Sequence, residues 1–136
     1  MSQLACDIVT PEAQLFSAEV YMVIVPGIEG EMGFLPGHAP LVSALADGVA
    51  SIRTEAGGAQ QRFALQGGYV EVTGSKVIVL ADRACAVEDI DAEALREQTA
   101  AAQAAFDALG ADDTAARLTL QSTLNWCALQ LKATQA

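Results

Sequence analysis

The chain has 136 residues and a formal net charge of −10, from 17 acidic and 7 basic side chains. This charge repels phosphate backbones and argues against nucleic acid as a partner. The length suits one or two small domains, and the longest uninterrupted apolar run, Tyr21 to Pro26, is far shorter than the roughly 20 residues of a membrane-spanning helix.

The first residues carry no recognisable targeting segment. They lack the basic start and apolar stretch of a secretion signal, and they lack the Arg- and Ser-rich character of a transit peptide. We therefore expect the chain to remain in the cytoplasm. Three cysteines match no zinc or redox spacing and are expected to be small buried hydrophobes: Cys6, Cys85 and Cys127.

Short runs of strand-forming residues fill the first two thirds of the chain, a pattern typical of a β-sandwich or barrel. Gly57-Gly58 and Gly74-Ser75 can form tight hairpin turns. The uninterrupted apolar run Val77–Leu80 predicts a central strand covered on both faces. The expected strands are Leu4–Val9, Glu19–Val25, Ala39–Ala44, Gly48–Thr54, Gln61–Leu65, Tyr69–Thr73, Lys76–Ala81 and Arg83–Val87.

The stretch from Gly27 to Leu41 contains four glycines, two prolines and the single histidine of the chain. The permissive angles of glycine and the fixed angle of proline disfavour a long regular element, so we expect a folded surface loop. Glu29, Glu31 and His38 lie between these turns. Their placement predicts a shaped surface that contacts a partner.

The composition changes after Val87, where strong helix formers take over. Asp89 or Asp91 can cap a first helix that ends near Leu109, with Gly110 as its left-handed cap. A second helix follows Asp112-Asp113. The sequence therefore predicts an α+β protein: an all-β sandwich or pseudo-barrel over residues 1–87 and an antiparallel two-helix hairpin over residues 88–136.

Each predicted helix carries an apolar stripe at helical spacing, and the two stripes should pack together. The stripes consist of Leu95, Ala102, Phe106 and Leu109 on the first helix, and Leu120, Leu124, Cys127 and Leu131 on the second. A further apolar strip on the second helix should meet the β domain or a partner. It consists of Leu118, Trp126 and Leu129.

Recognisable catalytic motifs are missing from the sequence. There is no phosphate-binding Gly-Lys-Ser/Thr loop. His38 has no cysteine or second histidine nearby for zinc, and no acid is placed to orient it toward Ser43. The acids around Asp91 suit the start of a helix better than a metal site. We expect a non-enzyme without catalytic residues, metal or cofactor.

Several segments in order resemble the epsilon subunit of F-type ATP synthase, the equivalent of the mitochondrial delta subunit. The resemblance covers the entire chain, and its most specific part is Gly-Glu-Met-Gly-Phe-Leu-Pro-Gly-His-Ala-Pro-Leu, from Gly30 to Leu41. It also includes Phe16-Ser17, Gln66–Val72 and Val79–Asp82.

The resemblance implies a non-catalytic rotor subunit of the central stalk that binds the gamma subunit and the ring of c subunits. Such a subunit couples proton translocation to ATP synthesis at the cytoplasmic face of the bacterial inner membrane. The resemblance assigns the c-ring contact to Glu29, Glu31 and His38. The residues that shape this loop would be Gly30, Gly33, Pro36, Gly37 and Pro40.

In this family the helical hairpin also acts as a regulatory arm that engages the alpha and beta catalytic subunits through basic side chains. The corresponding partner contacts here would be Arg117, Leu118, Trp126 and Leu129. The second helix carries only Arg117 and Lys132 as basic residues, and residues 88–136 hold eight acids against three bases. We therefore expect weak inhibition of ATP hydrolysis.

Some members also carry an ATP-binding pattern, Ile/Leu-Asp-x-x-Arg-Ala. Here Ile90-Asp91 is followed by Ala94-Leu95, and Arg96 is displaced by two positions, about 200° around a helix. ATP binding by the hairpin is therefore not expected.

Two other functions remain open at this stage. The chain could be a free-standing β-sandwich binding module whose hairpin serves as a dimerisation arm. An enzyme would require a carboxylate site that the sequence does not reveal.

Overall fold

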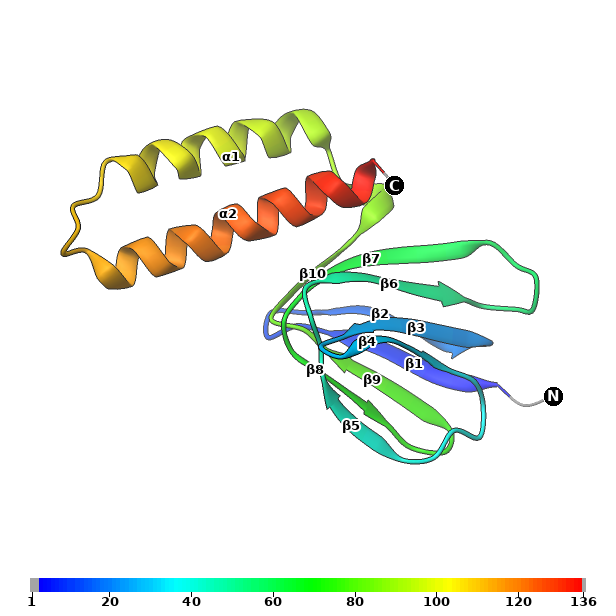
Figure 1. Cartoon of the computed structure of the whole chain (residues 1–136). Coiled ribbons are helices and arrows are strands. Elements are labelled where there is room, and N and C mark those ends of the chain that lie inside the picture. Colours follow the sequence, from blue (N-terminus) through cyan, green and yellow to red (C-terminus); the bar gives the residue numbers. More distant parts are fainter. Residues whose placement is uncertain (1–2, 136) are drawn as a thin grey trace. The chain divides into compact units, whose positions relative to one another are not determined.

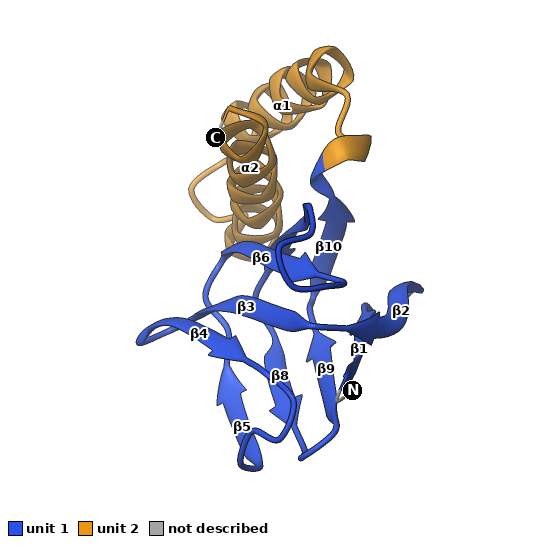
Figure 2. Cartoon of the chain, turned by 90° about the vertical axis from the view of Figure 1, so that its right-hand side faces the viewer, with its two compact units in different colours: residues 1–87 blue, residues 88–136 orange. Residues whose placement is uncertain are grey.

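The computed structural model describes residues 3–135. Met1 and Ser2 of the expected β domain, and Ala136 of the expected hairpin, lie outside the described residues. The chain divides into two compact units, Met1–Val87 and Glu88–Ala136. Figure 2 shows them in blue and orange. The predicted α+β class is confirmed, because strands in two sheets are followed by two helices.

The first sheet, sheet A, has the strand order β2-β1-β9-β8-β5 (Figure 1). Strands β1 and β9 are parallel, while the other neighbours in this sheet are antiparallel. Its strands are β1 (Leu4–Val9), β2 (Gln14–Val20), β5 (Leu41–Ala44), β8 (Tyr69–Val72) and β9 (Lys76–Leu80).

The second sheet, sheet B, has the order β10-β7-β6-β3-β4 and is antiparallel throughout. Strand β4 therefore forms a free edge of this sheet. The strands are β3 (Met22–Gly27), β4 (Gly30–Phe34), β6 (Gly48–Arg53), β7 (Gln60–Gln66) and β10 (Arg83–Ala86).

The core of the β unit is mainly aliphatic. Both sheets contribute alternate residues, which is the pattern of two sheets that bury their facing sides. Phe34 is the largest fully buried side chain, with an exposure of 1%. Other fully buried members include Leu4, Ile8, Val23, Val25, Ile52, Leu65, Val70, Val77 and Val79.

The expected single strand Glu19–Val25 is wrong. The structure has β2 up to Val20 and β3 from Met22, and the chain passes from sheet A to sheet B between them. Val20 and Val23 are both fully buried. Because residues an odd number apart lie on opposite faces of one strand, these two could not share a core within a continuous strand.

The expectation of a loop from Gly27 to Leu41 is also wrong in part. Strand β3 extends to Gly27, and Gly30–Phe34 forms β4, with Gly27 paired to Gly30 across a two-residue turn. Gly30 has a φ of +124°, which a residue with a side chain rarely adopts. The glycines therefore permit a tight hairpin at a sheet edge, where they weaken a strand without preventing it.

Strand β9 lies at the centre of sheet A, as predicted, but it is not covered on both faces. Val77 and Val79 are fully buried, whereas Leu80 is 46% exposed and Ile78 is half-buried. The apolar run therefore supplies the core on one side and an exposed apolar surface on the other.

A corner at Gly67-Gly68 carries the chain from β7 in sheet B to β8 in sheet A. The Gly67 amide donates to the Asp47 carboxylate (2.9 Å), and the Leu45 amide donates to the Gly68 carbonyl (2.9 Å). The Asp82 amide donates to the Gln66 carbonyl (3.1 Å). Three chain segments are thus tied together at one point. The predicted turns at Gly57-Gly58 and Gly74-Ser75 also lie between strands.

A short 3₁₀ turn (Val87–Asp89) precedes the hairpin, which consists of α1 (Ala92–Asp107) and α2 (Thr114–Thr134). The Asp91 carboxylate caps α1 by accepting bonds from the amides of Glu93 (3.0 Å) and Ala94 (3.2 Å). Of the two predicted caps, Asp91 is the correct one. The helices pack against each other, with Leu95 and Ala102 of α1 and Cys127 of α2 buried.

The turn of the hairpin differs from expectation. Helix α1 ends at Asp107, and its C-cap is Ala108 in a right-handed conformation rather than a left-handed Gly110. The Gly110 amide instead donates to the Asp113 carboxylate (2.9 Å). Because its carboxylate is bonded within the loop, Asp113 makes no side-chain cap bond to α2.

Candidate partner-binding surfaces

The β3–β4 turn presents two exposed carboxylates, one at its tip and one on β4. Glu29 lies beside Ile28 at the tip, and Glu31 pairs with Pro26 on the edge strand. Ile28 is 65% exposed, which places an apolar side chain next to Glu29. An exposed carboxylate beside an apolar group suits a contact with a polar protein surface.

Backbone hydrogen bonds anchor this turn to the rest of the β unit. The Ile28 amide donates to the Ala44 carbonyl (3.3 Å), and the Ala46 amide donates to the Pro26 carbonyl (2.8 Å). A side chain at Gly27 would lie 2.6 Å from the Gly30 carbonyl oxygen. The turn is therefore closely packed and held to β5, so its carboxylates are presented on a stiff support.

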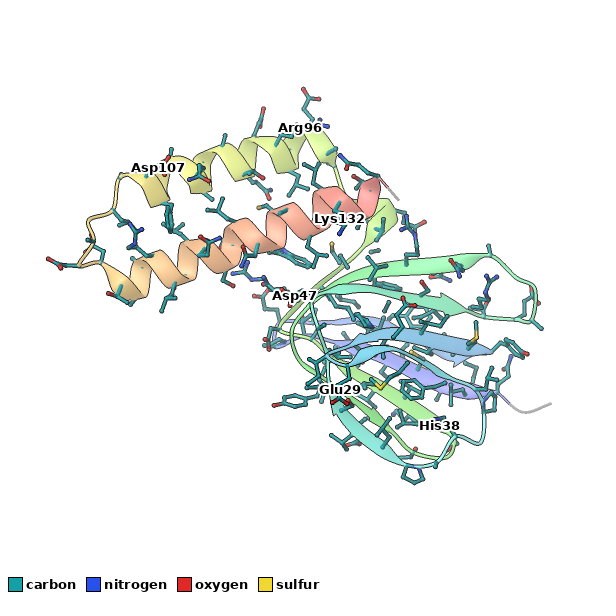
Figure 3. All side chains as sticks on the ribbon, in the orientation of Figure 1. Glu29, His38, Asp47, Arg96, Asp107 and Lys132 are labelled. Carbon is teal, nitrogen blue, oxygen red and sulfur yellow. The ribbon has the colours of Figure 1, made fainter. Side chains whose placement is uncertain are left out.

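His38 lies at the opposite end of β4 from Glu29. Strand β4 separates them by roughly 13 Å, at about 3.3 Å per residue. Figure 3 labels both residues, well apart on the β unit. The His38 ring packs edge-on against Phe34, with centroids 4.9 Å apart, and its Nδ1 lies 2.7 Å from the Ala39 carbonyl oxygen. The structure thus brings Glu29 and Glu31 to one end of β4 but leaves His38 at the other.

The loop from Leu35 to Pro40 is tied to the β8–β9 turn. The Gly37 amide donates to the Gly74 carbonyl (3.0 Å), and the His38 amide donates to the Leu35 carbonyl (3.2 Å). Pro36 and Pro40 flank this bonded segment. Gly30 and Gly37 have positive φ angles, and Gly27 has no room for a side chain. At Gly33 neither restriction applies, because an added side chain would make an ordinary 3.8 Å contact with Ile24.

A second candidate surface, which sequence reasoning missed, lies on the outer side of sheet A. Val42, Tyr69 and Leu80 are 66%, 58% and 46% exposed, and we call them the sheet A face. Tyr69 pairs directly with Leu80 and with Ala44, while Val42 pairs with the exposed Glu71, so one carboxylate lies among these side chains. The alternation in Tyr69–Thr73 was the signal that could have revealed it, because it sends Tyr69 away from the core.

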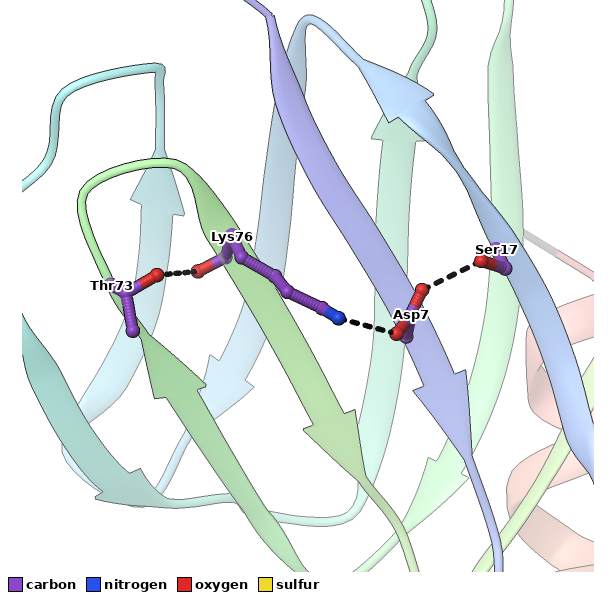
Figure 4. A network of polar contacts seen from close by, with 4 residues as sticks. All are labelled: Asp7, Ser17, Thr73 and Lys76. Atoms are coloured by element: carbon purple, nitrogen blue, oxygen red, sulfur yellow. Dashed lines mark hydrogen bonds and ion pairs between the residues drawn. The ribbon is translucent and has the colours of Figure 1, made fainter.

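Polar contacts on β1, β2 and the β8–β9 hairpin form a network on sheet A (Figure 4). The Ser17 hydroxyl donates to Asp7 Oδ1 (2.8 Å), and Lys76 Nζ lies 3.2 Å from Asp7 Oδ2. The Thr73 hydroxyl donates to the Lys76 carbonyl oxygen (3.4 Å). The Ser17 hydrogen bond, helped by Lys76, lowers the pKa of Asp7 although partial burial opposes this.

The Asp7 network should make folding stability depend on pH in acid. Because the folded-state pKa of Asp7 is lowered, its contribution is complete above the unfolded value of about 3.9 and is lost as pH falls through the folded value. We expect Asp7→Asn to reduce the free energy of unfolding at pH 7 by up to about 1 kcal/mol. Urea unfolding at several pH values should show this difference shrinking below about pH 4. A difference independent of pH would contradict it.

Buried thiols do not add a reactive site. Cys6 and Cys127 are buried and Cys85 is half-buried. Burial, followed by the negative charge of Asp7, raises the pKa of the Cys6 thiol to about 12. This thiol therefore stays protonated at neutral pH and is a poor nucleophile. Within residues 3–135 no three His, Cys, Asp or Glu side chains gather as metal ligands, and no helix is long and apolar enough to span a membrane.

The predicted partner contacts of the hairpin lie along α2. The Arg117 guanidinium carbon is 4.5 Å from the centroid of the Phe106 ring on α1. Leu118 is 68% exposed, whereas Trp126 and Leu129 are half-buried. The structure therefore places the one exposed residue of this set, Leu118, near the turn of the hairpin beside the half-buried Arg117.

Comparison with known proteins gives a consistent family. A family model described as the ATP synthase, Delta/Epsilon chain, beta-sandwich domain matches residues 3–87. An ATP synthase epsilon chain of Desulforamulus reducens is 42% identical over 106 residues, 78% of this chain and 79% of the relative. One of Parvibaculum lavamentivorans is 43% identical over 100 residues, 74% of this chain and 75% of the relative.

Solved structures show the same relationship. A chain of the Euglena gracilis mitochondrial ATP synthase, solved as an OSCP/F1/c-ring assembly, matches with a TM-score of 0.73 and 26% identity. That match covers 100% of this chain and 83% of the other. A chain from the central stalk and c-ring of the Tetrahymena thermophila enzyme shares the fold, with a TM-score of 0.56, 15% identity and 96% coverage of both chains.

Proposed function

Because the chain belongs to the family of ATP synthase delta/epsilon chains, we propose that it is a non-catalytic rotor subunit in the central stalk of an F-type ATP synthase. It would couple proton translocation to ATP synthesis as a peripheral protein on the cytoplasmic face of a bacterial inner membrane. The observation that carries this proposal is the family match over nearly the whole β unit, residues 3–87. The exposed surfaces of that unit supply its two partner contacts.

The free edge of β4 is the proposed contact with the c-ring. Glu29 and Glu31 are exposed at one end of this edge, and His38 lies at the other, so the contact would have two separate points. Carboxylates can form hydrogen bonds and ion pairs with polar loops of a ring. The anchored turn and the bonded loop at Gly37 would transmit lateral force without a deep apolar anchor.

The sheet A face is the proposed contact with the gamma subunit. Val42, Tyr69 and Leu80 form an exposed and mainly apolar surface beside Glu71, which suits a lasting contact between two parts of a rotor. Aromatic residues at the centre of such surfaces commonly supply much of the binding energy. This division of surfaces leaves the β4 edge free for the ring.

Charge reversal at Glu31 tests the proposed ring contact. In membrane vesicles holding the assembled complex, we expect Glu31→Lys to reduce proton-driven ATP synthesis several-fold, since reversing one rim charge costs on the order of 1 kcal/mol. The matched control is Glu12→Lys, which makes the same charge change at an exposed position between β1 and β2. Equal synthesis by both variants would contradict the contact. Recovery of the chain apart from membranes would favour a free-standing binding module.

The hairpin is proposed as a weak regulatory arm that contacts the alpha and beta subunits through Arg117, Leu118, Trp126 and Leu129. The excess of acids over bases in the hairpin, eight against three, would weaken its electrostatic attraction to an acidic segment of a catalytic subunit. Removal of residues 88–136 tests this proposal in the same vesicles. The deletion should change the rate of ATP hydrolysis by less than about twofold, which corresponds to less than about 0.5 kcal/mol of activation free energy. Strong activation of hydrolysis would contradict weak inhibition.

A further inference from the structure

An open pocket of about 350 Å³ lies at the turn of the hairpin, wholly inside the second unit. Thr114, Arg117, Leu118 and Gln121 follow the spacing of one face of α2, and Phe106 and Ala111 complete the lining. The volume is within the range of roughly 300–1,000 Å³ that small-molecule sites occupy. Neither proposed contact of the β unit involves this pocket.

Arg117 gives the pocket a positively charged side chain without a direct ion-pair partner among the described residues. One face of its guanidinium covers the Phe106 ring at 4.5 Å, and no carboxylate among the described residues forms an ion pair with it. Neighbouring carboxylates have other partners: Asp113 accepts from the Gly110 amide (2.9 Å) and Asp107 accepts from the Gln103 side chain (2.9 Å). The fork of N–H donors on Arg117 is thus available to a planar anion.

Apolar groups lie next to this charge. The Phe106 ring and the Leu118 side chain, which is 68% exposed, line the same pocket. The Thr114 hydroxyl and the Gln121 amide add neutral hydrogen-bonding groups. The lining therefore offers one site for an anionic head and an adjoining surface for an apolar body.

We propose that this pocket binds a small amphiphilic monocarboxylate. The carboxylate would accept two parallel hydrogen bonds from the Arg117 guanidinium, and an aromatic or aliphatic body would cover Phe106 and Leu118. A single negative charge fits better than several, because residues 88–136 hold eight acids against three bases and so repel polyanions. This ligand class does not rest on the proposed rotor function, although Arg117 and Leu118 are also proposed contacts of the hairpin with the alpha and beta subunits.

Titration of the full-length chain with 2-naphthoate tests the proposal by NMR. We expect binding in the range of about 0.1–1 mM, with the largest shifts at the amides of the pocket residues. The uncharged analogue 2-naphthalenemethanol should bind at least about tenfold more weakly, because it cannot form charge-assisted hydrogen bonds with the arginine. ATP should bind more weakly than 2-naphthoate. These comparisons use the unaltered chain and do not depend on any variant.

Two substitutions test whether binding depends on Arg117 itself or only on the net charge of the hairpin. Arg117→Gln should weaken 2-naphthoate binding at least about tenfold, whereas Arg96→Gln, the matched loss of an exposed arginine on α1 away from the pocket, should leave it unchanged. No binding up to about 5 mM would overturn the proposal. Equal affinity for the alcohol, equal affinity of Arg117→Gln, or tighter binding of ATP would also overturn it.

Discussion

Replacing Gly68 by alanine is expected to destabilise the β unit by about 3–4 kcal/mol. Gly68 has a φ of +104°, and an added side chain would overlap the Leu80 carbonyl oxygen and lie 2.8 Å from the Ala81 Cα. Both obstacles are backbone atoms. The backbone there is held by the pairing of Tyr69 with Leu80, so it cannot shift without breaking sheet A.

Hydrogen exchange of the amides in β7, β8 and β9 would measure this loss in the full chain. The matched control is Gly74→Ala in the neighbouring β8–β9 turn. An added side chain at Gly74 would meet nothing within 4 Å, so the expected change is less than about 1 kcal/mol. Similar protection in both variants would show that the corner tolerates a side chain.

Introducing a charge at Tyr69 is expected to reduce affinity for the gamma subunit by about 30-fold or more, which corresponds to roughly 2 kcal/mol or more for a central aromatic residue. Tyr69 pairs with both Ala44 and Leu80, so its side chain lies between β5 and β9 on the sheet A face. Tyr69→Asp would leave an unpaired carboxylate in a desolvated contact. The residue is 58% exposed, so the fold itself should tolerate the change.

Co-purification and titration calorimetry with the gamma subunit would measure this effect. Gln61→Asp is the matched control, because it places the same charge at an exposed strand position of sheet B. Tyr69→Phe should bind as the unaltered chain does, since it keeps the aromatic ring. If Gln61→Asp abolished binding and Tyr69→Asp did not, the gamma contact would lie on sheet B.

Local patterns predicted many of the elements of the β unit. Strand β1 was predicted with its observed bounds, and β6 to β10 within two residues at each end, because apolar periodicity and glycine turns are encoded locally. Helix α1 was located by its Asp91 cap for the same reason. The missed strands, β2 and β4, lie at sheet edges, where exposed side chains weaken the periodic signal.

Pairing between distant segments decided the geometry of the candidate surfaces. The sequence placed Glu29, Glu31 and His38 in one loop, but β4 separates His38 from the two glutamates. The sheet A face depends on β5, β8 and β9 becoming neighbours, although residues 45–68 separate the first two along the chain.

Local periodicity, composition and ordered motifs were enough to predict the class of the fold, the division of strands from helices and the family. They did not predict which side chains share a surface, such as Tyr69 with Leu80 and Arg117 with Phe106. The physical reason is that burial and cross-strand contact arise from segments far apart in the chain, and no local pattern specifies which strand lies beside which.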